Sequence, residues 1–335
     1  MDHSMGIPMA AIVLKGVAIK GKNEGSGTMA SSLKKSVAGV NPGNRPPAAL
    51  ELAPEGVLAA ALPGKGQAAV FAYVPLPSGS VVPGIDEANL KAPDQVKAAI
   101  VKALEEVSPR THNVTLVLPD TSVRVFVLDF DSLPQKMSEV ISVLKFRLRK
   151  MVPFDVEPAG VSYQVLSASE SECKALVAVL PGSILAEYEG AVRAAGYEPG
   201  AVLPSSLAAL AVLDSPEPAL AACLSGASLT TSITHGQDLL LYRTLDLPGD
   251  AAQRLAEVQR DIAVAAAYYE DKLGMRARRL YYGGLGTADD FARWLKVNDP
   301  EMTVVDLVER PATGATTTLG RIGMAGITGA LAGVA

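Results

Sequence analysis

Short apolar runs separated by turn residues occupy positions 48–74 of the chain. The runs AALEL, GVLAAAL and AAVFAYV are separated by Gly56 and by the Pro63-Gly64 pair. Glycine and proline between apolar runs favour tight turns, so the pattern predicts a meander of three strands.

A helix and a buried strand are predicted next. Asp94 can cap a helix whose apolar residues recur at helical spacing and which stops before Pro109. The apolar run 114–118 then fits a central strand that is covered on both faces. Three strands, a helix and a strand would together form the first part of an α/β domain, over 48–120.

Residues 135–151 have the periodicity of an amphipathic helix. Pro153 should end it, because proline disfavours helical geometry in the residue before it. Lys145 and Arg149 fall on the face opposite to the apolar stripe. The expected buried stripe has steps of four, three, four and three: Met137, Ile141, Leu144, Leu148 and Met151.

This helix belongs to a larger pattern of alternating elements. Over 121–200 the chain predicts a compact β-α-β-β-α-β unit of the split-βαβ kind, inserted into the surrounding domain. Gly196 marks the end of the second helix of this unit. The predicted strands are 123–128, 161–166, 173–180 and 201–203, and the predicted helices are 135–151 and 184–195.

The second half of the chain repeats the alternation of strands and helices. Turns are expected at Gly226 and Gly236, and the Gly283-Gly284 pair closes a further strand. The predicted elements are a short helix over 207–213, strand pairs within 219–247, a helix over 250–273, a strand over 279–282, a helix around Trp294, a strand over 303–308 and a closing helix within 316–335.

Composition adds the size and the charge of the protein. With 335 residues, of which 49% are hydrophobic and 19% charged, the chain can form about two domains with sizeable cores. Residues 1–47 carry six Lys and Arg against two Asp and Glu, so the remaining chain carries 24 against 33 and a net charge of −9. An acidic body argues against nucleic acid as the main ligand. The sequence contains no run of 18 strongly apolar residues, so no membrane span is predicted.

Cysteine and histidine are too few and too scattered to predict a metal site. Cys173 and Cys223 are far apart and fit small core residues of a reduced, cytoplasmic protein. His3, His112 and His235 have few soft partners nearby, so no zinc site is expected. No Ser-His-Asp, Cys-His or paired-carboxylate pattern indicates a catalytic centre.

The first 47 residues are interpreted as lying outside the fold. Gly25-Ser26-Gly27 has the composition of a linker and Met29 resembles a new start, so 1–28 is expected to be an appended segment. Two interpretations stay open for it: a leader or tag, or a partner peptide tethered by the linker. Residues 31–47 are predicted to be a flexible arm.

The order of strand, basic helix, the phrase VPFD at 152–155 and strand resembles the inserted subdomain of the PilM-type proteins of type IV pilus assembly. The phrase AGYEP at 195–199 matches the same family. The resemblance implies an α/β, actin-like (FtsA/PilM-type) two-lobed fold with an inserted subdomain. The domains it implies are an appended segment and arm (1–47), the first actin-like subdomain (48–120), the insert (121–200), a return to the first subdomain (201–218), the second lobe (219–315) and a closing helix (316–335).

The same resemblance points to a nucleotide site that has lost its chemistry. Actin-like ATPases hold phosphates between two hairpins, whose backbone N–H groups bind phosphate oxygens and whose Asp-x-Gly carboxylates hold the metal. Here Ala53 and Pro54 stand where a glycine and an N–H donor belong, and Leu224 stands at the position of the second aspartate.

Other acids offer little compensation. Glu51 or Asp214 could in principle replace the missing carboxylate, but an isolated acid is usually a solvated one. No ATPase activity, no metal and no cofactor are therefore expected, although ATP is the ligand that such a site would hold. The glycines that match the degenerate nucleotide site are Gly226, Gly283 and Gly284.

The function that the resemblance implies is that of a non-catalytic cytoplasmic scaffold. PilM-type proteins bind the N-terminal cytoplasmic peptide of the inner-membrane protein PilN in a groove between the inserted subdomain and the core. They thereby link a PilO-like protein and the pilus motor ATPase, and lie at the inner membrane through these partners, with self-association left open. Carried over to this chain, the groove residues are Arg124, Lys145, Arg149 and Phe154.

Three alternatives stay open at this point. The basic residues could simply form a solvated helix face. The chain could be an ATP-binding, FtsA-like polymerising protein, which would require nucleotide affinity that is lost on changing Gly226 or the Gly283-Gly284 pair. It could also be a cytoplasmic domain of the GspL kind from type II secretion, a kind that continues into a membrane span.

Overall fold

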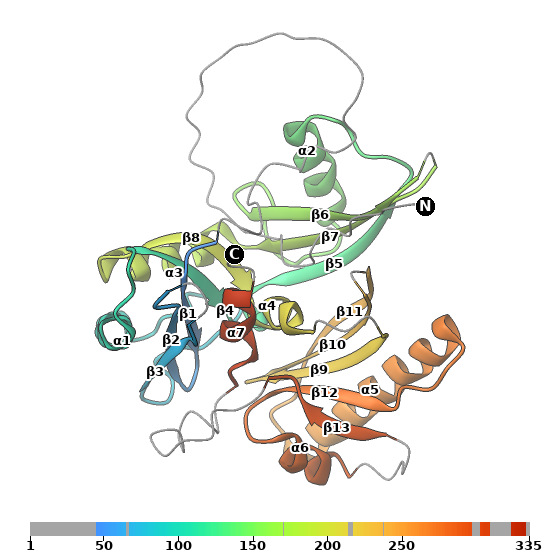
Figure 1. Ribbon diagram of the computed structural model, residues 1–335. Coiled ribbons are helices and arrows are strands. Elements are labelled where there is room, and N and C mark those ends of the chain that lie inside the picture. Colours follow the sequence, from blue (N-terminus) through green and yellow to red (C-terminus); the bar gives the residue numbers. More distant parts are fainter. Residues whose placement is uncertain are drawn as a thin grey trace.

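The computed structural model describes residues 45–64, 67–169, 171–213, 217–236, 238–296, 302–308 and 323–332. The expectations for the appended segment, and for most of the arm that follows it, lie outside these ranges. The described chain contains two five-stranded sheets and one three-stranded sheet. Figure 1 shows the three sheets as separate bodies, with the smallest sheet above the other two.

The first sheet has the strand order β3-β2-β1-β4-β8. β1, β2 and β3 form an antiparallel meander, as the spacing of glycine and proline predicts. β4 lies parallel to both β1 and β8 and is the buried central strand expected over 114–118. The strands are β1 (Ala48–Ala53), β2 (Gly56–Ala61), β3 (Val70–Pro75), β4 (Asn113–Leu118) and β8 (Glu198–Pro204).

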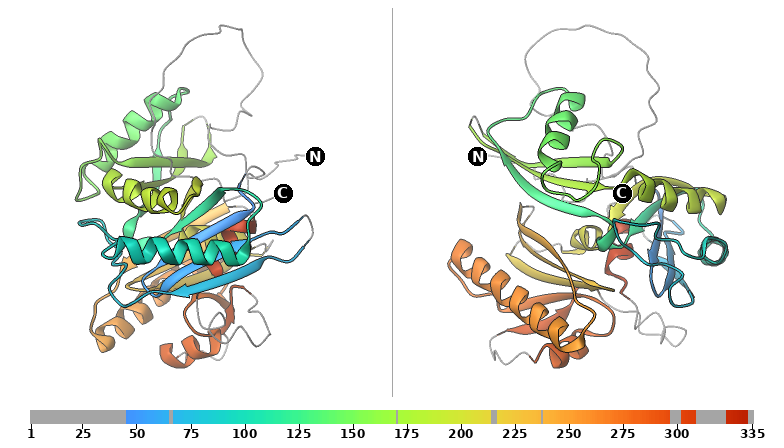
Figure 2. Two further views of the ribbon diagram at one scale, coloured as in Figure 1. Left: turned by 90° about the vertical axis from the view of Figure 1, so that its left-hand side faces the viewer. Right: turned by 180° about the vertical axis from the view of Figure 1, so that it is seen from behind.

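Helices cover both faces of this sheet, because successive strand residues point to opposite faces. Leu50 and Leu116 face the apolar cluster that includes residues of α1 and α3. Figure 2 shows these two helices crossing one side of the sheet. Ala49 and Val117 face the cluster that holds α4 and α7. The helices are α1 (Pro93–Val107), α3 (Gly182–Ala194), α4 (Ser205–Ala209) and α7 (Ala325–Ala332), with short 3₁₀ turns at Asp120–Ser122 and Leu210–Val212.

The insert is smaller than the sequence pattern suggests. Its antiparallel sheet has the order β5-β7-β6, and α2 packs on one face. The elements follow in the expected order, but α3 packs into the core of the first lobe and β8 pairs with β4. The prediction that this last helix and strand belong to the insert is therefore wrong. The insert comprises β5 (Arg124–Phe130), α2 (Met137–Leu148), β6 (Gly160–Ala168) and β7 (Cys173–Leu180).

The buried stripe of α2 also differs from the expected one. Val140, Leu144 and Leu148 are buried against the sheet. Met137 is 46% exposed and Met151 is 39% exposed, so the prediction that both are core residues is wrong. Met137 is the first residue of the helix and Met151 lies in the turn after its last residue, so both lie beyond the part of the helix that the small sheet covers.

The second lobe is built on the sheet β11-β10-β9-β12-β13. β9, β10 and β11 are antiparallel, whereas β12 runs parallel to β9 and to β13. The predicted turns at Gly226 and Gly236 are confirmed, and both glycines have positive φ angles, of 51° and 57°. The strands are β9 (Ala219–Ser225), β10 (Ser228–His235), β11 (Asp238–Asp246), β12 (Arg279–Gly284) and β13 (Thr303–Asp306).

The helix α5 (Ala251–Leu273) packs on this sheet through an apolar cluster that includes Val258 and Ile262. Asp250 caps its first turn by accepting two backbone N–H groups. Asp261 is buried on the same helix and accepts a hydrogen bond from the Thr231 hydroxyl at 2.9 Å. The helix is therefore fixed to β10 by a polar contact as well as by apolar packing.

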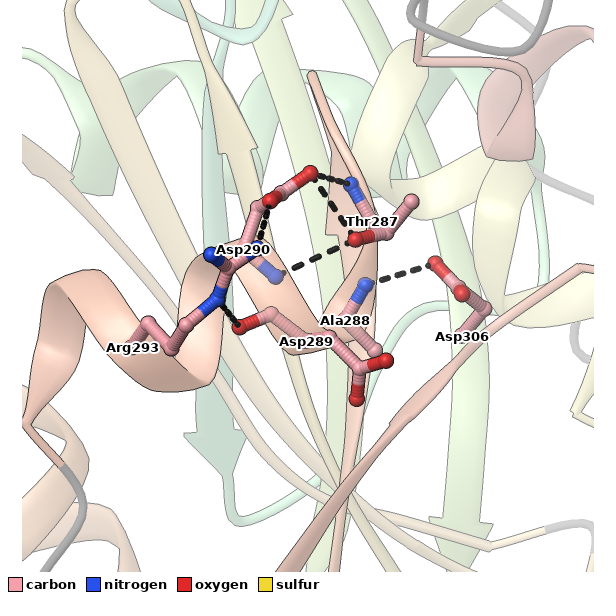
Figure 3. A network of polar contacts seen from close by, with 6 residues as sticks. All are labelled: Thr287, Ala288, Asp289, Asp290, Arg293 and Asp306. Atoms are coloured by element: carbon pink, nitrogen blue, oxygen red, sulfur yellow. Dashed lines mark hydrogen bonds and ion pairs between the residues drawn. The ribbon is translucent and has the colours of Figure 1, made fainter.

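A capping network attaches the shorter helix α6 (Ala288–Leu295) to β13 (Figure 3). The Thr287 hydroxyl accepts from the backbone N–H of Asp290 at 3.1 Å, and the Asp290 carboxylate accepts from the backbone N–H of Thr287 at 3.2 Å. Asp306 at the end of β13 accepts from the Ala288 N–H at 3.1 Å. Two N–H groups of the first helical turn are therefore satisfied, one by a local hydroxyl and one by a carboxylate distant in sequence.

Two general properties bear on function. In the part of the chain that the structure describes, no helix is both long enough and apolar enough to cross a membrane. Within the same residues, no group of three His, Cys, Asp or Glu could hold a metal ion.

Both cysteines are buried free thiols, and burial raises the pKa of the Cys223 thiol to about 12.

Candidate functional site

A cleft lies where the first and second lobes meet. Its wall comes from the hairpin between β1 and β2, the hairpin between β9 and β10, the end of β12, and the first residues of α4 and α7. The cavity volume is about 50 Å³, whereas pockets for small-molecule ligands usually measure about 300–1,000 Å³. The three glycines of the expected nucleotide site all line this cleft: Gly226, Gly283 and Gly284.

The first hairpin offers few donors to an anion. It turns at Pro54 and Glu55, and Pro54 has no N–H group. The Tyr73 hydroxyl donates to the Glu55 carbonyl at 2.6 Å, which holds the turn against β3. A Cβ atom on Gly56 would meet the Val74 carbonyl oxygen at 2.5 Å, so this glycine serves close strand packing.

The second hairpin, between β9 and β10, is held by a hydrogen bond from α5. Gly226 has a positive φ angle, and its carbonyl accepts a hydrogen bond from Arg254 of α5. A Cβ atom placed on Gly226 would lie 3.7 Å from Cγ of Pro54. The two hairpins therefore approach each other closely across the cleft, and Pro54 fills part of the gap.

Gly283 and Gly284 are required by packing. A Cβ atom on Gly283 would lie 3.0 Å from Sγ of Cys223 and 3.2 Å from Cβ of Ala325. A Cβ atom on Gly284 would lie 2.7 Å from the Leu224 carbonyl oxygen. Neither glycine has a positive φ angle. The close approach of β12 to β9 and to α7 thus explains both residues without a nucleotide.

Glu51 is the acid that the cleft encloses most completely. It is 8% exposed, and the Ser205 hydroxyl donates to its Oε1 at 2.6 Å. Its Oε2 has no hydrogen-bond partner among the described residues, and a Cβ atom on Gly326 would lie 3.0 Å from it. Burial raises the pKa of the Glu51 carboxyl from 4.5 to about 7.

A second buried carboxylate lies behind the first. Asp120 lies two residues after the end of β4 and is 2% exposed. It accepts from the backbone N–H of Ser206 at 3.0 Å and from the Ser206 hydroxyl at 2.5 Å. Burial raises its pKa to about 6. Both serines begin α4 directly after β8, so the carboxyl ends of three parallel strands bring these polar groups together.

The electrostatics of the cleft do not favour phosphate. Among the described lining residues there are two acids, Glu51 and Glu55, and no lysine or arginine. A phosphate chain brought into this cleft would meet like charges at short range without a compensating cation. Glu51 stands on β1, whereas Asp214, the other acid considered from the sequence, lies outside the described residues.

Glu51 should make the stability of the protein depend on pH. Its folded-state pKa of about 7 exceeds the ordinary value of 4.5, so the stability that its protonated form contributes is lost as the pH rises through 7. The Glu51→Gln variant removes this titration. Between pH 5 and pH 8 the wild type should therefore lose about 2 kcal/mol of unfolding free energy relative to the variant.

The measurement is urea unfolding of both proteins at the two pH values. Glu106→Gln on the exposed side of α1 is the matched control, since Glu106 is an exposed residue. It should shift stability equally at both pH values. A difference between wild type and Glu51→Gln that is the same at pH 5 and pH 8 would contradict the buried titration.

The four residues expected to bind a partner peptide do not form one group. Lys145 donates to the backbone carbonyl of Glu157, and Arg149 pairs with the carboxylate of the same residue. Arg124 on β5 pairs instead with Asp246 of β11 at 2.9 Å, so it connects the insert to the second lobe. Phe154 is half-buried against the core of the insert.

A different polar residue marks the junction between the insert and the first lobe. Gln164 on β6 is 8% exposed, and its Oε1 has no hydrogen-bond partner among the described residues. It pairs across the ladder with Leu176, which faces the core of the first lobe. Sequence reasoning missed it, because a single glutamine within an apolar strand gives no signal until the facing element is known.

Comparison with solved structures places the fold. No family model and no curated protein matches the sequence significantly. A structure described as the PilM-PilN type IV pilus biogenesis complex is 19% identical and has a TM-score of 0.68, covering 86% of this chain and 98% of that chain. The actin-like fold expected from the resemblance to PilM-type proteins is thereby confirmed.

Two further structures are more distant. The cytoplasmic domain of EpsL, an inner-membrane component of the type II secretion system of Vibrio cholerae, is 15% identical with a TM-score of 0.45, covering 70% of this chain and 80% of that chain. A Bacteroides thetaiotaomicron protein described as having an actin-like ATPase fold and unknown function is 10% identical with a TM-score of 0.45, covering 81% and 93%.

Proposed function

We propose that this protein is a non-catalytic cytoplasmic scaffold of a type IV pilus assembly complex, which binds the N-terminal cytoplasmic peptide of a PilN-like inner-membrane protein. The observation that carries the proposal is the fold shared with a PilM-PilN complex over 86% of this chain and 98% of the other. Through that peptide the protein would connect a PilO-like protein and the pilus motor ATPase, and would lie at the inner membrane without spanning it.

The cleft between the lobes supports the non-catalytic part of the proposal. Its cavity of about 50 Å³ has no lysine or arginine among the described lining residues. Pro54 and Leu224 occupy the places of a backbone donor and of a metal-binding acid. Among the described lining residues, no cationic side chain is placed to stabilise the charge that develops on a transferred phosphoryl group.

The peptide site is assigned to the junction of the insert with the first lobe. β6 pairs with β7 alone among the described strands, so its other edge can receive an extended peptide as an added strand. The unpartnered Oε1 of Gln164 lies on this strand. Arg124, Lys145, Arg149 and Phe154 remain predictions for the same groove, with the basic residues already held by Asp246 and Glu157.

The test is a titration with a fluorescent peptide of the N-terminal cytoplasmic residues of the candidate inner-membrane protein, followed by anisotropy. Wild type should bind it and should not bind a scrambled peptide. Gln164→Leu should weaken binding about fivefold, which corresponds to one lost hydrogen bond. Gln253→Leu on the exposed start of α5 makes the same chemical change elsewhere and should leave the affinity unchanged.

A nucleotide experiment runs beside it. With MgATP present, phosphate release should not exceed that of a heat-denatured sample. Release above this background, or ATP affinity lost in Gly226→Val, would favour the ATP-binding, FtsA-like alternative. Absence of binding to the native peptide would instead contradict the scaffold proposal. The peptide titration and the ATP assay therefore test the two functions independently.

A further inference from the structure

Exposed apolar side chains are concentrated on one helix of the insert and the turn that follows it. Nine large hydrophobic residues are exposed in the described chain, and four of them fall within 137–151. Phe146 is the most exposed of all, at 69%. Single exposed apolar residues are ordinary, but a group on one element marks a surface that is covered in the working protein. The four residues are Met137, Val143, Phe146 and Met151.

Positive charge is concentrated at the same place. Residues 145–150 contain four Lys and Arg, and no Asp or Glu occurs from 140 to 154. Lys150 is exposed and has no ion pair among the described residues. The chain beyond residue 47 nevertheless has a net charge of −9, so this cluster differs in sign from the rest of the body.

The apolar and cationic residues are adjacent along the chain. Val143 and Phe146 lie three residues apart, which places them on the same side of α2, while Leu144 and Leu148 are buried on the other side. Lys150 lies in the turn that directly follows the helix. Arg147 borders this face, held by the Asp129 carbonyl and lying over the Phe130 ring. Both views in Figure 2 show α2 at the outer end of the insert, away from the second lobe.

We propose that this face of α2 binds the surface of an anionic lipid bilayer. Lys150 and its neighbouring cations would pair with lipid phosphates, and Phe146 and Val143 would enter the boundary between head groups and acyl chains. A helix with a basic, aromatic-containing outer face lies in the plane of such a boundary, and each basic residue near an anionic leaflet contributes to the attraction.

The combination of charge and apolar side chains favours a bilayer over a second copy of the chain or a soluble polyanion as the partner of this face. A second copy that docked through the same face would bring the cations of both copies together, because a two-fold interface places a patch against itself. A soluble polyanion would bind the cations but would leave Phe146 in water. The bilayer surface satisfies the apolar and the cationic residues at once.

The experiment is flotation of the purified full-length chain with vesicles, in the absence of any protein partner. Vesicles with about 30% phosphatidylglycerol in phosphatidylcholine should carry the protein at low salt, and vesicles of phosphatidylcholine alone should not. Salt at about 0.5 M should release most of the bound protein, because the Debye length falls to a few ångströms. Since no peptide is present, the outcome is independent of the proposed scaffold function.

Matched substitutions identify the face. Phe146→Ser and Lys150→Glu should each reduce the bound fraction at least about fivefold. Met275→Ser removes an apolar side chain that is 52% exposed outside the insert, and Lys102→Glu reverses an exposed charge on α1; both should bind as the wild type does. Circular dichroism checks that each variant is folded. Equal binding to neutral vesicles, no binding at all, or full binding by Phe146→Ser would overturn the proposal.

Discussion

Replacing Leu144 with alanine should lower the unfolding free energy by about 2–5 kcal/mol, the range measured when buried leucines are truncated. Leu144 is fully buried between α2 and the sheet of the insert. Its apolar cluster combines residues of the helix with residues of all three strands of the insert, so the cavity that alanine leaves cannot close without moving the helix. The loss adds removed apolar burial to the free energy of the residual cavity.

Urea unfolding measures the effect, and hydrogen exchange of the α2 amides shows whether the insert opens separately. Met137→Ala is the matched control on the same helix. Because Met137 is 46% exposed, its truncation should change stability by less than about 0.5 kcal/mol. Equal effects at the two positions would mean that the buried side of α2 is assigned to the wrong residues.

A single methyl group on Gly329 should be nearly as damaging as the loss of Leu144. A Cβ atom there would lie 1.9 Å from the carbonyl oxygen of Ala208 and 2.6 Å from its carbonyl carbon. Both are backbone atoms of α4, so no side-chain rotation can relieve the overlap, and α7 would have to move as a body. We expect Gly329→Ala to cost about 3 kcal/mol, at the upper end for overpacked cores.

The control for this variant is a glycine-to-alanine change that should raise the unfolding free energy instead of lowering it. Gly190 lies within α3, is exposed, and has no atom within 4 Å of an added Cβ. Alanine is the better helix former by about 1 kcal/mol, so Gly190→Ala should stabilise the protein. Thermal unfolding of the two variants beside the wild type gives the comparison. Stabilisation by Gly329→Ala would mean that α7 does not pack on α4 as described.

Local patterns predicted most of the elements, because periodicity and turn residues act over a few positions. They could not predict pairing. The run at β8 has the same composition whether it joins the insert or the first lobe, and only its position beside β4 decides. The partners of a strand depend on contacts distant in sequence, which no local signal carries. For this reason the sequence pattern predicts an insert that wrongly includes α3 and β8.

In the candidate site, too, local features could be predicted from the sequence and contacts between distant residues could not. The glycines of the two hairpins and of β12 were identified from the sequence, and the structure brings them to one cleft. Lys145 and Arg149 were expected to be available to a partner. Their carbonyl and carboxylate partner, Glu157, lies in the loop that follows the helix, and loop geometry cannot be read from composition. Asp120 did carry a signal, since it comes two residues after the end of a buried strand.

The position of α7 has a consequence for biosynthesis. The apolar cluster on one face of the first sheet combines residues from the beginning of the fold, such as Ala49 and Leu58, with Ile327 and Leu331 of α7. The second lobe is formed from 219–308 and has its own core. On the ribosome the second lobe can therefore acquire its core before the first one is complete. The lobe that is translated first therefore completes its core last, and until α7 emerges the alanine- and leucine-rich part of the sheet that α7 covers stays exposed to solvent.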